Sequence, residues 1–208
     1  MAVGALEQYG PHLPLGSNTL VAERVVEEVS QRLEILRAPT FSYGVTAGGG
    51  PYAGTSGLRR KTLHRAINEL LARWEDHGVT QFVLVTAHRF DPHVEALLMA
   101  LTARATTTVF DLSQVDVSDL VQEDPMAAHG GELETSLLLH LAPERVRTQE
   151  IEDFLPDART LRKYTRGRVP TPPPGSRGAV GHASWASAEK GRAVFTRYVG
   201  ALQRFLAR

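Results

Sequence analysis

The chain alternates between two patterns of apolar residues. In five stretches, apolar side chains repeat every three or four positions and charged residues occupy positions between them, which is the pattern of an amphipathic helix. Two short segments, residues 82–85 and 106–112, follow helical stretches and are typical of buried strands. Helices that alternate with buried strands predict an α/β fold with a largely parallel central sheet between two layers of helices. The predicted helices cover about residues 19–33, 63–77, 92–101, 132–141 and 187–206.

Asn18 stands immediately before the first helical pattern. Its side-chain oxygen can accept a backbone N–H at the start of a helix, where such groups lack a partner within the helix. One interpretation of Asn18 is therefore a helix cap. A role in a functional site is the alternative.

The sequence contains no internal repeat and no convincing domain boundary. Its 208 residues are enough for one well-buried core, so we expect a single domain over residues 1–208. Residues 171–175 (TPPPG) contain three consecutive prolines, which exclude a helix or an interior strand. This segment is predicted to be a loop.

Composition excludes several classes of function. Lys and Arg together number 23, as do Asp and Glu, so no net charge favours nucleic acid or an anionic membrane. The chain has no cysteine, so histidines and carboxylates must carry any chemistry. No apolar run approaches the roughly 20 residues of a spanning helix, and no basic-then-apolar signal pattern follows Met1. We therefore expect a cytoplasmic protein that binds a small molecule and neither nucleic acid nor membrane.

Polar residues are densest in residues 4–18 (GALEQYGPHLPLGSN), a strand-to-loop segment directly before a helix. In open α/β sheets, sites are built from such loops at strand ends. The segment resembles the signature of the creatininase family of amidohydrolases, which runs Gly-x-x-Glu-Gln-His-Gly-Pro-His-Leu-Pro-Leu and then, after a short gap, an Asp.

Three further segments are similar to family motifs and follow in the family's order. Residues 51–58 (PYAGTSGL) resemble its Phe-Pro-Gly-Thr-x-Ser-Leu loop. Residues 86–91 (TAHRFD) stand where the family has the turn Asn-Gly-His-Gly-Gly-Asn, and residues 129–136 (HGGELETS) resemble its His-Ala-Gly-x-x-Glu-Thr-Ser segment. The resemblance continues weakly over residues 181–191 and covers nearly the whole chain.

The resemblance implies a three-layer α/β/α fold and a homo-oligomer, either a hexamer or a dimer. Family members usually carry a helix and most of a strand before the first motif, whereas Met1 lies only six residues before Glu7. We therefore expect the first strand to be shortened.

The resemblance also implies two divalent metals, held by a Glu and a His of the first motif, a bridging Asp, the His of the turn and a further carboxylate. Glu7 and His88 match the Glu of the first motif and the His of the turn. Tyr9 stands in place of the first-motif His, Asn18 in place of the bridging Asp, and Phe90 where the turn can supply the further carboxylate.

These departures weaken a metal pair for physical reasons. A bridging carboxylate offers two anionic oxygens, whereas the Asn18 amide offers one neutral oxygen. A phenol such as Tyr9, with an ordinary pKa of about 10, must lose a proton before it binds a metal well. The sequence therefore predicts either one weakly held zinc, manganese or iron ion at Glu7 and His88, with help from Asn18 or Asp91, or no metal.

The family places a histidine that handles protons during C–N cleavage at the position of His129. We predict His129 as a general acid or base, with Glu132 and Glu134 as further catalytic residues. Glu134 could instead lie in the first turn of a helix, where the helix dipole favours carboxylates. The predicted substrate-binding residues are Tyr9, His12, Asn18, Tyr52 and Phe90.

Three functions are compatible with these residues. The first is a creatininase-like enzyme that acts on an amide, lactam or related C–N bond of a small molecule, by hydrolysis or by the reverse condensation, with an incomplete or absent metal pair. The second is a non-catalytic paralogue that binds a metabolite or partners an active homologue. The third is a metal-dependent amidohydrolase with substitute ligands such as Tyr9, Asp91 and Glu134.

Overall fold

The computed structural model describes residues 1–47, 52–100, 102, 104–157, 159–160 and 172–207. The predicted helices and strands are all present, whereas the predicted helix end at Leu101, the loop residue Thr171 and the motif residue Pro51 lie outside the described residues. The α-helices are α1 (Ser17–Leu33), α2 (Arg60–Asp76), α3 (Asp91–Leu98), α4 (Glu132–Leu141) and α6 (Ala188–Leu206). The strands are β1 (Gln81–Thr86) and β2 (Thr106–Asp111). The short 3-10 helices are η1 (Leu112–Gln114), η2 (Pro143–Arg145), η3 (Thr148–Glu150) and η4 (Ala183–Trp185).

The strands β1 and β2 pair in parallel, from Gln81 opposite Thr106 to Thr86 opposite Asp111. Two extended segments continue the sheet beyond β1. The Val3 N–H donates to the Val85 carbonyl at 2.8 Å, and the Gly4 N–H donates to the Phe41 carbonyl at 2.8 Å. Both contacts are parallel bridges, so the central sheet is parallel throughout these four segments, as expected.

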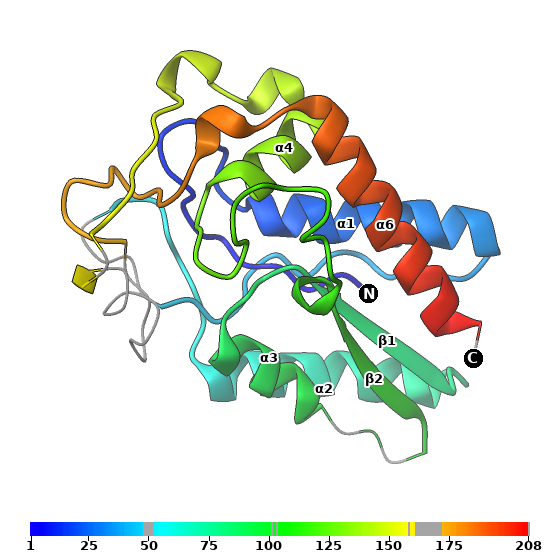
Figure 1. Cartoon of the computed structure of the whole chain (residues 1–208). Helices are drawn as coiled ribbons and strands as arrows, with labels where there is room; N and C mark the ends of the chain where they lie inside the picture. Colours follow the sequence, from blue (N-terminus) through cyan, green and yellow to red (C-terminus); the bar gives the residue numbers. More distant parts are fainter. Residues whose placement is uncertain (48–51, 101, 103, 158, 161–171, 208) are drawn as a thin grey trace.

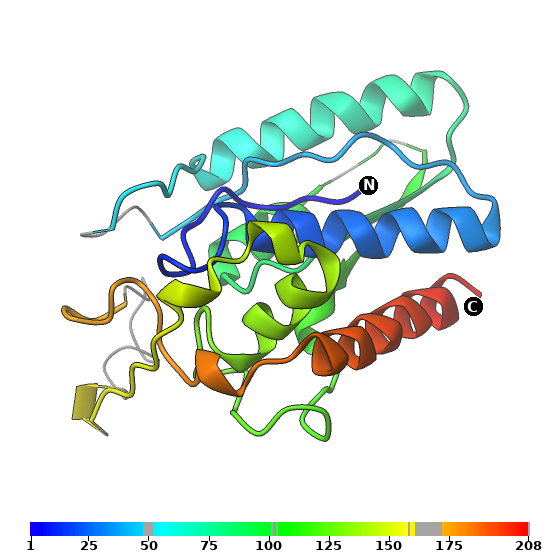
Figure 2. The same cartoon turned by 90° about the horizontal axis from the view of Figure 1, so that it is seen from above.

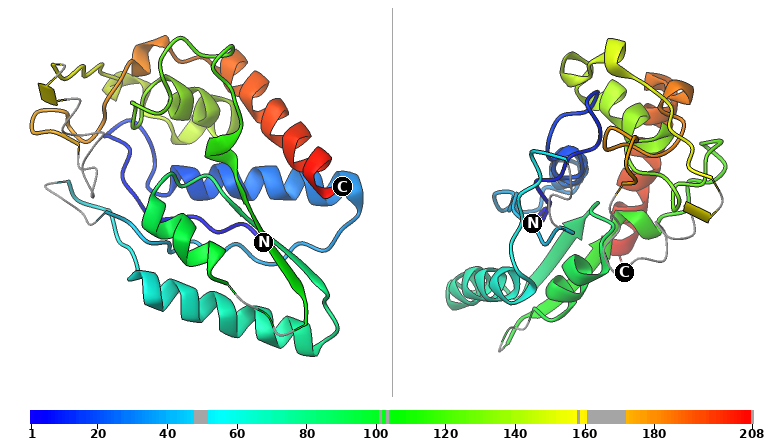
Figure 3. Two further views of the ribbon diagram at one scale, coloured as in Figure 1. Left: turned by 60° about the horizontal axis from the view of Figure 1, so that its bottom comes forward. Right: turned by 90° about the vertical axis from the view of Figure 1, so that its left-hand side faces the viewer.

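Helices cover both faces of this sheet. Successive β1 side chains point to opposite sides, so that Val85 packs with α1, α4 and α6, whereas Leu84 packs with α2 and α3. Figure 1 shows α2 and α3 on one side of the strands and the other three helices on the opposite side, and Figure 3 shows the same layers from two other directions. Seen from above, α1 and α6 are neighbours (Figure 2). The predicted three-layer α/β/α architecture is confirmed.

In the described part of the chain, no helix combines the length and the apolar character needed to cross a membrane.

The start of α1 differs from the prediction. Gly16 occupies the N-cap position in a left-handed conformation, with φ of 75°, and the helix begins at Ser17. Asn18 therefore lies inside the first turn, and no side chain caps this helix. The interpretation of Asn18 as a cap is wrong, because the turn at Gly16 starts the helix earlier and leaves the Asn18 amide facing Tyr9 and His88.

The helices α4 and α6 pack closely at Gly191. A Cβ atom added there would lie 1.9 Å from the Ser136 carbonyl oxygen and 2.5 Å from its carbon. Both are backbone atoms of α4, so they cannot move aside without shifting the helix. Glycine at this position therefore sets the distance between the two helices.

We predict that Gly191→Ala destabilises the protein although alanine favours helix formation. Overpacking of this kind costs about 1–3 kcal/mol, which outweighs the roughly 0.5–1 kcal/mol that alanine gains over glycine within a helix. Gly200→Ala in the same helix is the matched control, since a Cβ there meets only the flexible end of Arg204 at 3.3 Å. Urea unfolding should show a loss for the first variant and none for the second. Equal stabilities would contradict the proposed contact.

Candidate functional site

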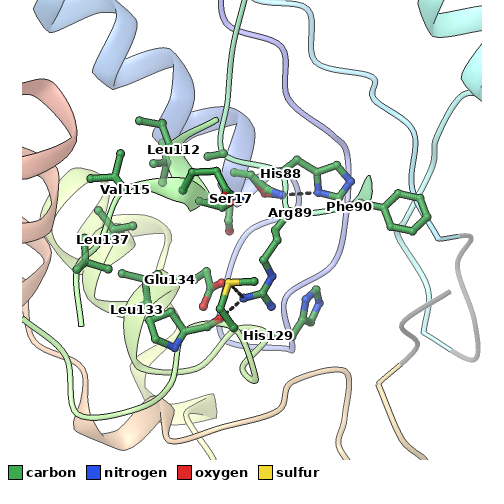
Figure 4. A pocket seen from close by; sticks show the side chains of 18 of the residues that line it. Ser17, His88, Arg89, Phe90, Leu112, Val115, His129, Leu133, Glu134 and Leu137 are labelled. Carbon is green, nitrogen blue, oxygen red and sulfur yellow. Dashed lines mark hydrogen bonds between the residues drawn. The ribbon is translucent and has the colours of Figure 1, made fainter. Parts of the chain in front are cut away.

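A cavity of about 590 Å³ is lined by residues that follow the carboxyl ends of β1 and β2 (Figure 4). The remaining walls come from the segment before α1, the first turns of α1 and α4, and Tyr198 of α6. Polar loops at the ends of parallel strands are the usual place for a ligand site in this architecture. The cavity brings together the predicted site residues Glu7, Tyr9, Asn18, His88, Phe90, Asp91, His129 and Glu134.

Four of these side chains form one buried hydrogen-bond network. The Asn18 amide nitrogen lies 2.5 Å from the Tyr9 hydroxyl and 2.8 Å from Nδ1 of His88. The Tyr9 hydroxyl donates to Oε2 of Glu7 at 3.2 Å, and the same oxygen lies 3.3 Å from Nδ1 of His88. Three separate segments, the first motif, α1 and the turn after β1, are therefore joined at one point.

The two ring nitrogens of His88 have different partners. Nε2 lies 2.8 Å from the Val45 carbonyl, which can only accept, so Nε2 carries a proton. Nδ1 faces both the Asn18 amide nitrogen at 2.8 Å and the Glu7 carboxylate at 3.3 Å, so it accepts from the amide when unprotonated and donates to the carboxylate when protonated. A histidine whose second nitrogen donates to a backbone carbonyl is also the usual arrangement of a metal ligand.

The pKa values of Glu7 and Tyr9 are shifted in opposite directions. Burial alone would raise the pKa of Glu7, but the hydrogen bond and charge of His88, with His129 and Tyr9, lower it to about 2. Burial, together with the charges of Glu7 and Glu134, raises the pKa of Tyr9 well above its usual value of 10. At neutral pH the network therefore contains a carboxylate and a neutral phenol.

His129 lies on the other side of Tyr9. The two rings stack with centroids 4.2 Å apart and planes inclined by 19°. Nε2 of His129 lies 2.8 Å from the Gln8 carbonyl, so this nitrogen carries a proton, and Nδ1 has no hydrogen-bond partner among the described residues. Gly130 follows with φ of 69°, and a Cβ there would lie 2.5 Å from the Tyr9 carbonyl oxygen, so only glycine fits.

Glu134 contributes another carboxylate to the cavity wall. It lies in the first turn of α4, where the helix dipole favours a negative charge. Its Oε2 atom is buried and has no hydrogen-bond partner within the described part of the chain. Both sequence interpretations of Glu134 are therefore compatible with its position.

Three other predicted residues do not reach the cavity. Glu132 is fully buried, accepts the N–H groups of Gln122 and Glu123 at 2.7 and 2.9 Å, and pairs with Lys190.

His12 and Tyr52 are likewise engaged elsewhere. Nε2 of His12 lies 2.9 Å from Oγ1 of Thr135. The Tyr52 hydroxyl donates to the Pro173 carbonyl at 2.7 Å and lies 2.9 Å from Ser176. The fold uses these side chains, like Glu132, to connect its segments, which their sequence positions alone did not indicate.

A family model described as creatinine amidohydrolase matches residues 1–206. The chain belongs to the creatininase family. The creatinine amidohydrolase of Pseudomonas putida is 28% identical over 221 residues, which cover 93% of this chain and 82% of that protein. The mycofactocin precursor peptide peptidase of Mycobacterium ulcerans (strain Agy99) is 31% identical over 214 residues, which cover 95% of this chain and 79% of that protein.

Comparison with solved structures agrees with this assignment. A crystal structure of creatinine amidohydrolase (creatininase) superposes with a TM-score of 0.80 and 26% identity, covering 98% of this chain and 86% of that one. The creatininase family acts on amide C–N bonds.

Three of the four motif segments contribute residues to the cavity, whereas residues 52–58 do not. Tyr9 and Phe90 occupy two positions where the resemblance implies metal ligands. Among the residues that the structure describes, no group of three or more His, Asp or Glu side chains is placed to hold a metal ion.

Sequence reasoning did not assign a role to Arg89, which also lines the cavity. A signal for it was present, since Arg89 replaces a glycine of the family turn.

The buried position of His12 predicts a specific pH dependence. Burial lowers the pKa of His12 from 6.5 to about 4. Between these values the unfolded chain binds a proton at His12 and the folded chain does not, so acidification destabilises the folded state. We expect His12 to contribute a loss of roughly 3 kcal/mol in unfolding free energy as the pH falls from about 6.5 to about 4.

This contribution can be isolated by comparing variants. His12→Gln should lack that part of the pH dependence in urea unfolding, whereas His77→Gln, at an exposed position, should retain it. If the pH dependence of His12→Gln matches that of the unsubstituted protein, His12 does not carry the effect.

Proposed function

We propose that this creatininase-family protein acts on an amide, lactam or related C–N bond of a small molecule bound in the cavity, without a complete pair of metals. One observation carries the proposal. The cavity retains Glu7, His88 and His129 at motif positions, while Tyr9 is bonded to Glu7 and Asn18 where the family would have a metal ligand.

The residues present do not fit a two-metal centre. Tyr9 keeps its proton because its pKa is raised, so its oxygen is a poor ligand at neutral pH. Phe90 offers no donor atom. The Asn18 amide also lacks the second anionic oxygen that a bridging ligand needs.

Proton transfer can instead be assigned to His129. Its Nε2–H is held by the Gln8 carbonyl, which leaves Nδ1 free to take a proton from a water molecule. The water oxygen then bonds to the amide carbon, the C–N bond breaks, and Nδ1 returns the proton to the leaving nitrogen. The reverse sequence would form the same bond: the amine nitrogen bonds to the carboxyl carbon, its proton passes through Nδ1, and water leaves.

A second candidate is a one-metal amidohydrolase. It is favoured by the close approach of two acceptors, Oε2 of Glu7 and Nδ1 of His88, and by the buried Oδ1 of Asn18, which has no partner among the described residues. A half-turn of the Asn18 amide would bring this oxygen to the same point. One related solved structure is described as a manganese form of creatininase.

Metal content separates these possibilities. We expect the purified, never-chelated protein to contain no more than one zinc, manganese or iron ion per chain by elemental analysis. Glu7→Gln should reduce any bound metal, since a neutral amide replaces the carboxylate beside His88. A value near two ions per chain would overturn the proposal and support substitute ligands.

The role of His129 is tested by turnover of a panel of small amides and lactams. His129→Ala should lower kcat/KM about 100-fold to 10,000-fold, the usual contribution of a positioned acid or base. His77→Ala, at an exposed position, is the control and should leave turnover unchanged. Unchanged turnover in His129→Ala would remove this residue from the mechanism, and no turnover by the intact protein would favour the non-catalytic paralogue.

A further inference from the structure

Arg89 places a guanidinium group inside the cavity. Its backbone belongs to the turn after β1, and its side chain ends between Glu134 and His129 (Figure 4). The group is held in place by the loop before α4. Nη1 donates to the Pro125 carbonyl and lies 3.7 Å from the Met126 sulfur, and Nη2 donates to the Ala128 carbonyl at 2.8 Å.

These contacts leave part of the guanidinium free. Three of its five N–H groups are used, so the Nε–H and one Nη2–H have no partner within the described residues. The Nε and Nη2 edge of a guanidinium presents two parallel N–H groups, which match the two oxygens of a carboxylate. Arg89 therefore has two unused donors, one on Nε and one on Nη2, that a carboxylate can bind.

Arg89 also lacks a negatively charged partner. Among the described residues, no carboxylate lies within ion-pair distance of its side chain, whereas several surface arginines have one, such as Arg60 with Glu95 and Arg177 with Glu150. A half-buried cation that is bonded only to neutral groups retains its attraction for an anion.

Five carboxylates line the cavity. Glu7 is engaged by His88 and Tyr9, and the carboxylates of Asp116 and Asp124 accept N–H groups of their own loop, from Ser118 and Met126. Glu134 lies nearest to the guanidinium in Figure 4, but neither it nor Asp91 forms an ion pair or a hydrogen bond with Arg89 among the described residues.

We propose that Arg89 binds a carboxylate group of the substrate, so that the molecule acted on carries both an amide-type C–N bond and a carboxylate. The family turn has glycine at this position, so a member with that glycine lacks this guanidinium. This inference deepens the proposed function, and it depends on that function only where it calls the bound molecule a substrate. The binding of a carboxylate at Arg89 can be tested without turnover.

The test compares acids with their neutral amides. N-Acetylglycine, N-acetyl-β-alanine and pyroglutamate, each paired with its primary amide, are titrated into the full chain at neutral pH by calorimetry, with inorganic phosphate as a second anion. We expect at least one acid to bind about tenfold to hundredfold more tightly than its amide, the usual effect of hydrogen bonds to a charged group. Phosphate should bind more weakly than this acid.

Variants then assign the preference to Arg89. Arg89→Met should abolish the difference between acid and amide, while Arg60→Met, which removes a surface arginine, should retain it. Arg89 also holds the loop before α4, so thermal unfolding must show that the variant is folded. If it is not, Arg89→Lys serves instead, because lysine keeps the charge and loses the paired donors, and most of the preference should disappear.

Several results would overturn this inference. They are equal binding of every acid and its amide, no binding of any acid up to about 10 mM, tighter binding of phosphate, or a preference that survives in the Arg89 variants. Turnover of the amide panel is measured in parallel. Acid binding through Arg89 without turnover would contradict the proposed function alone, whereas turnover without an acid preference would contradict this inference alone.

Discussion

The parallel pairing of β1 with β2 is the constraint on which the rest of the molecule depends. Parallel strands end at the same edge of a sheet, so the turn after β1 and the loop after β2 must lie close together. The segment at Val3 runs in the same direction beside β1 and delivers the first motif to that edge. Residues from Glu7 to His129 can therefore share a cavity although more than half of the chain separates them.

The architecture could be predicted because each element carries its own signal. Apolar periodicity is local, and it located the five α-helices and both strands named here to within a few residues. Side-chain partners are not local. Glu132 lies two residues from Glu134 and was predicted to share its catalytic role. Side chains two positions apart on a helix point in different directions, so Glu132 pairs with Lys190 whereas Glu134 lines the cavity. Asn18 was ambiguous for the same reason, since the left-handed turn at Gly16 decided which groups its amide would meet.

The network at Glu7 holds a carboxylate and an imidazole together by hydrogen bonds. A metal would hold a carboxylate and an imidazole together by coordination. Here the phenol of Tyr9 and the amide of Asn18 connect the same two groups by hydrogen bonds. Neutral donors of this kind preserve the spacing of the side chains without requiring a cation. The Glu7 carboxylate beside His88 nevertheless still attracts positive charge.

The cavity is lined by helical segments and by irregular segments of the chain. Part of its lining comes from the start of α1 and the first turns of α4, whereas residues 115–118 and 124–126 are irregular chain. Substitutions in irregular surface segments disturb a fold less than substitutions in packed helices. Relatives of this protein can therefore diverge in the molecules they accept by changing these irregular segments, while Asn18 and Glu134 stay fixed in the first turns of their helices.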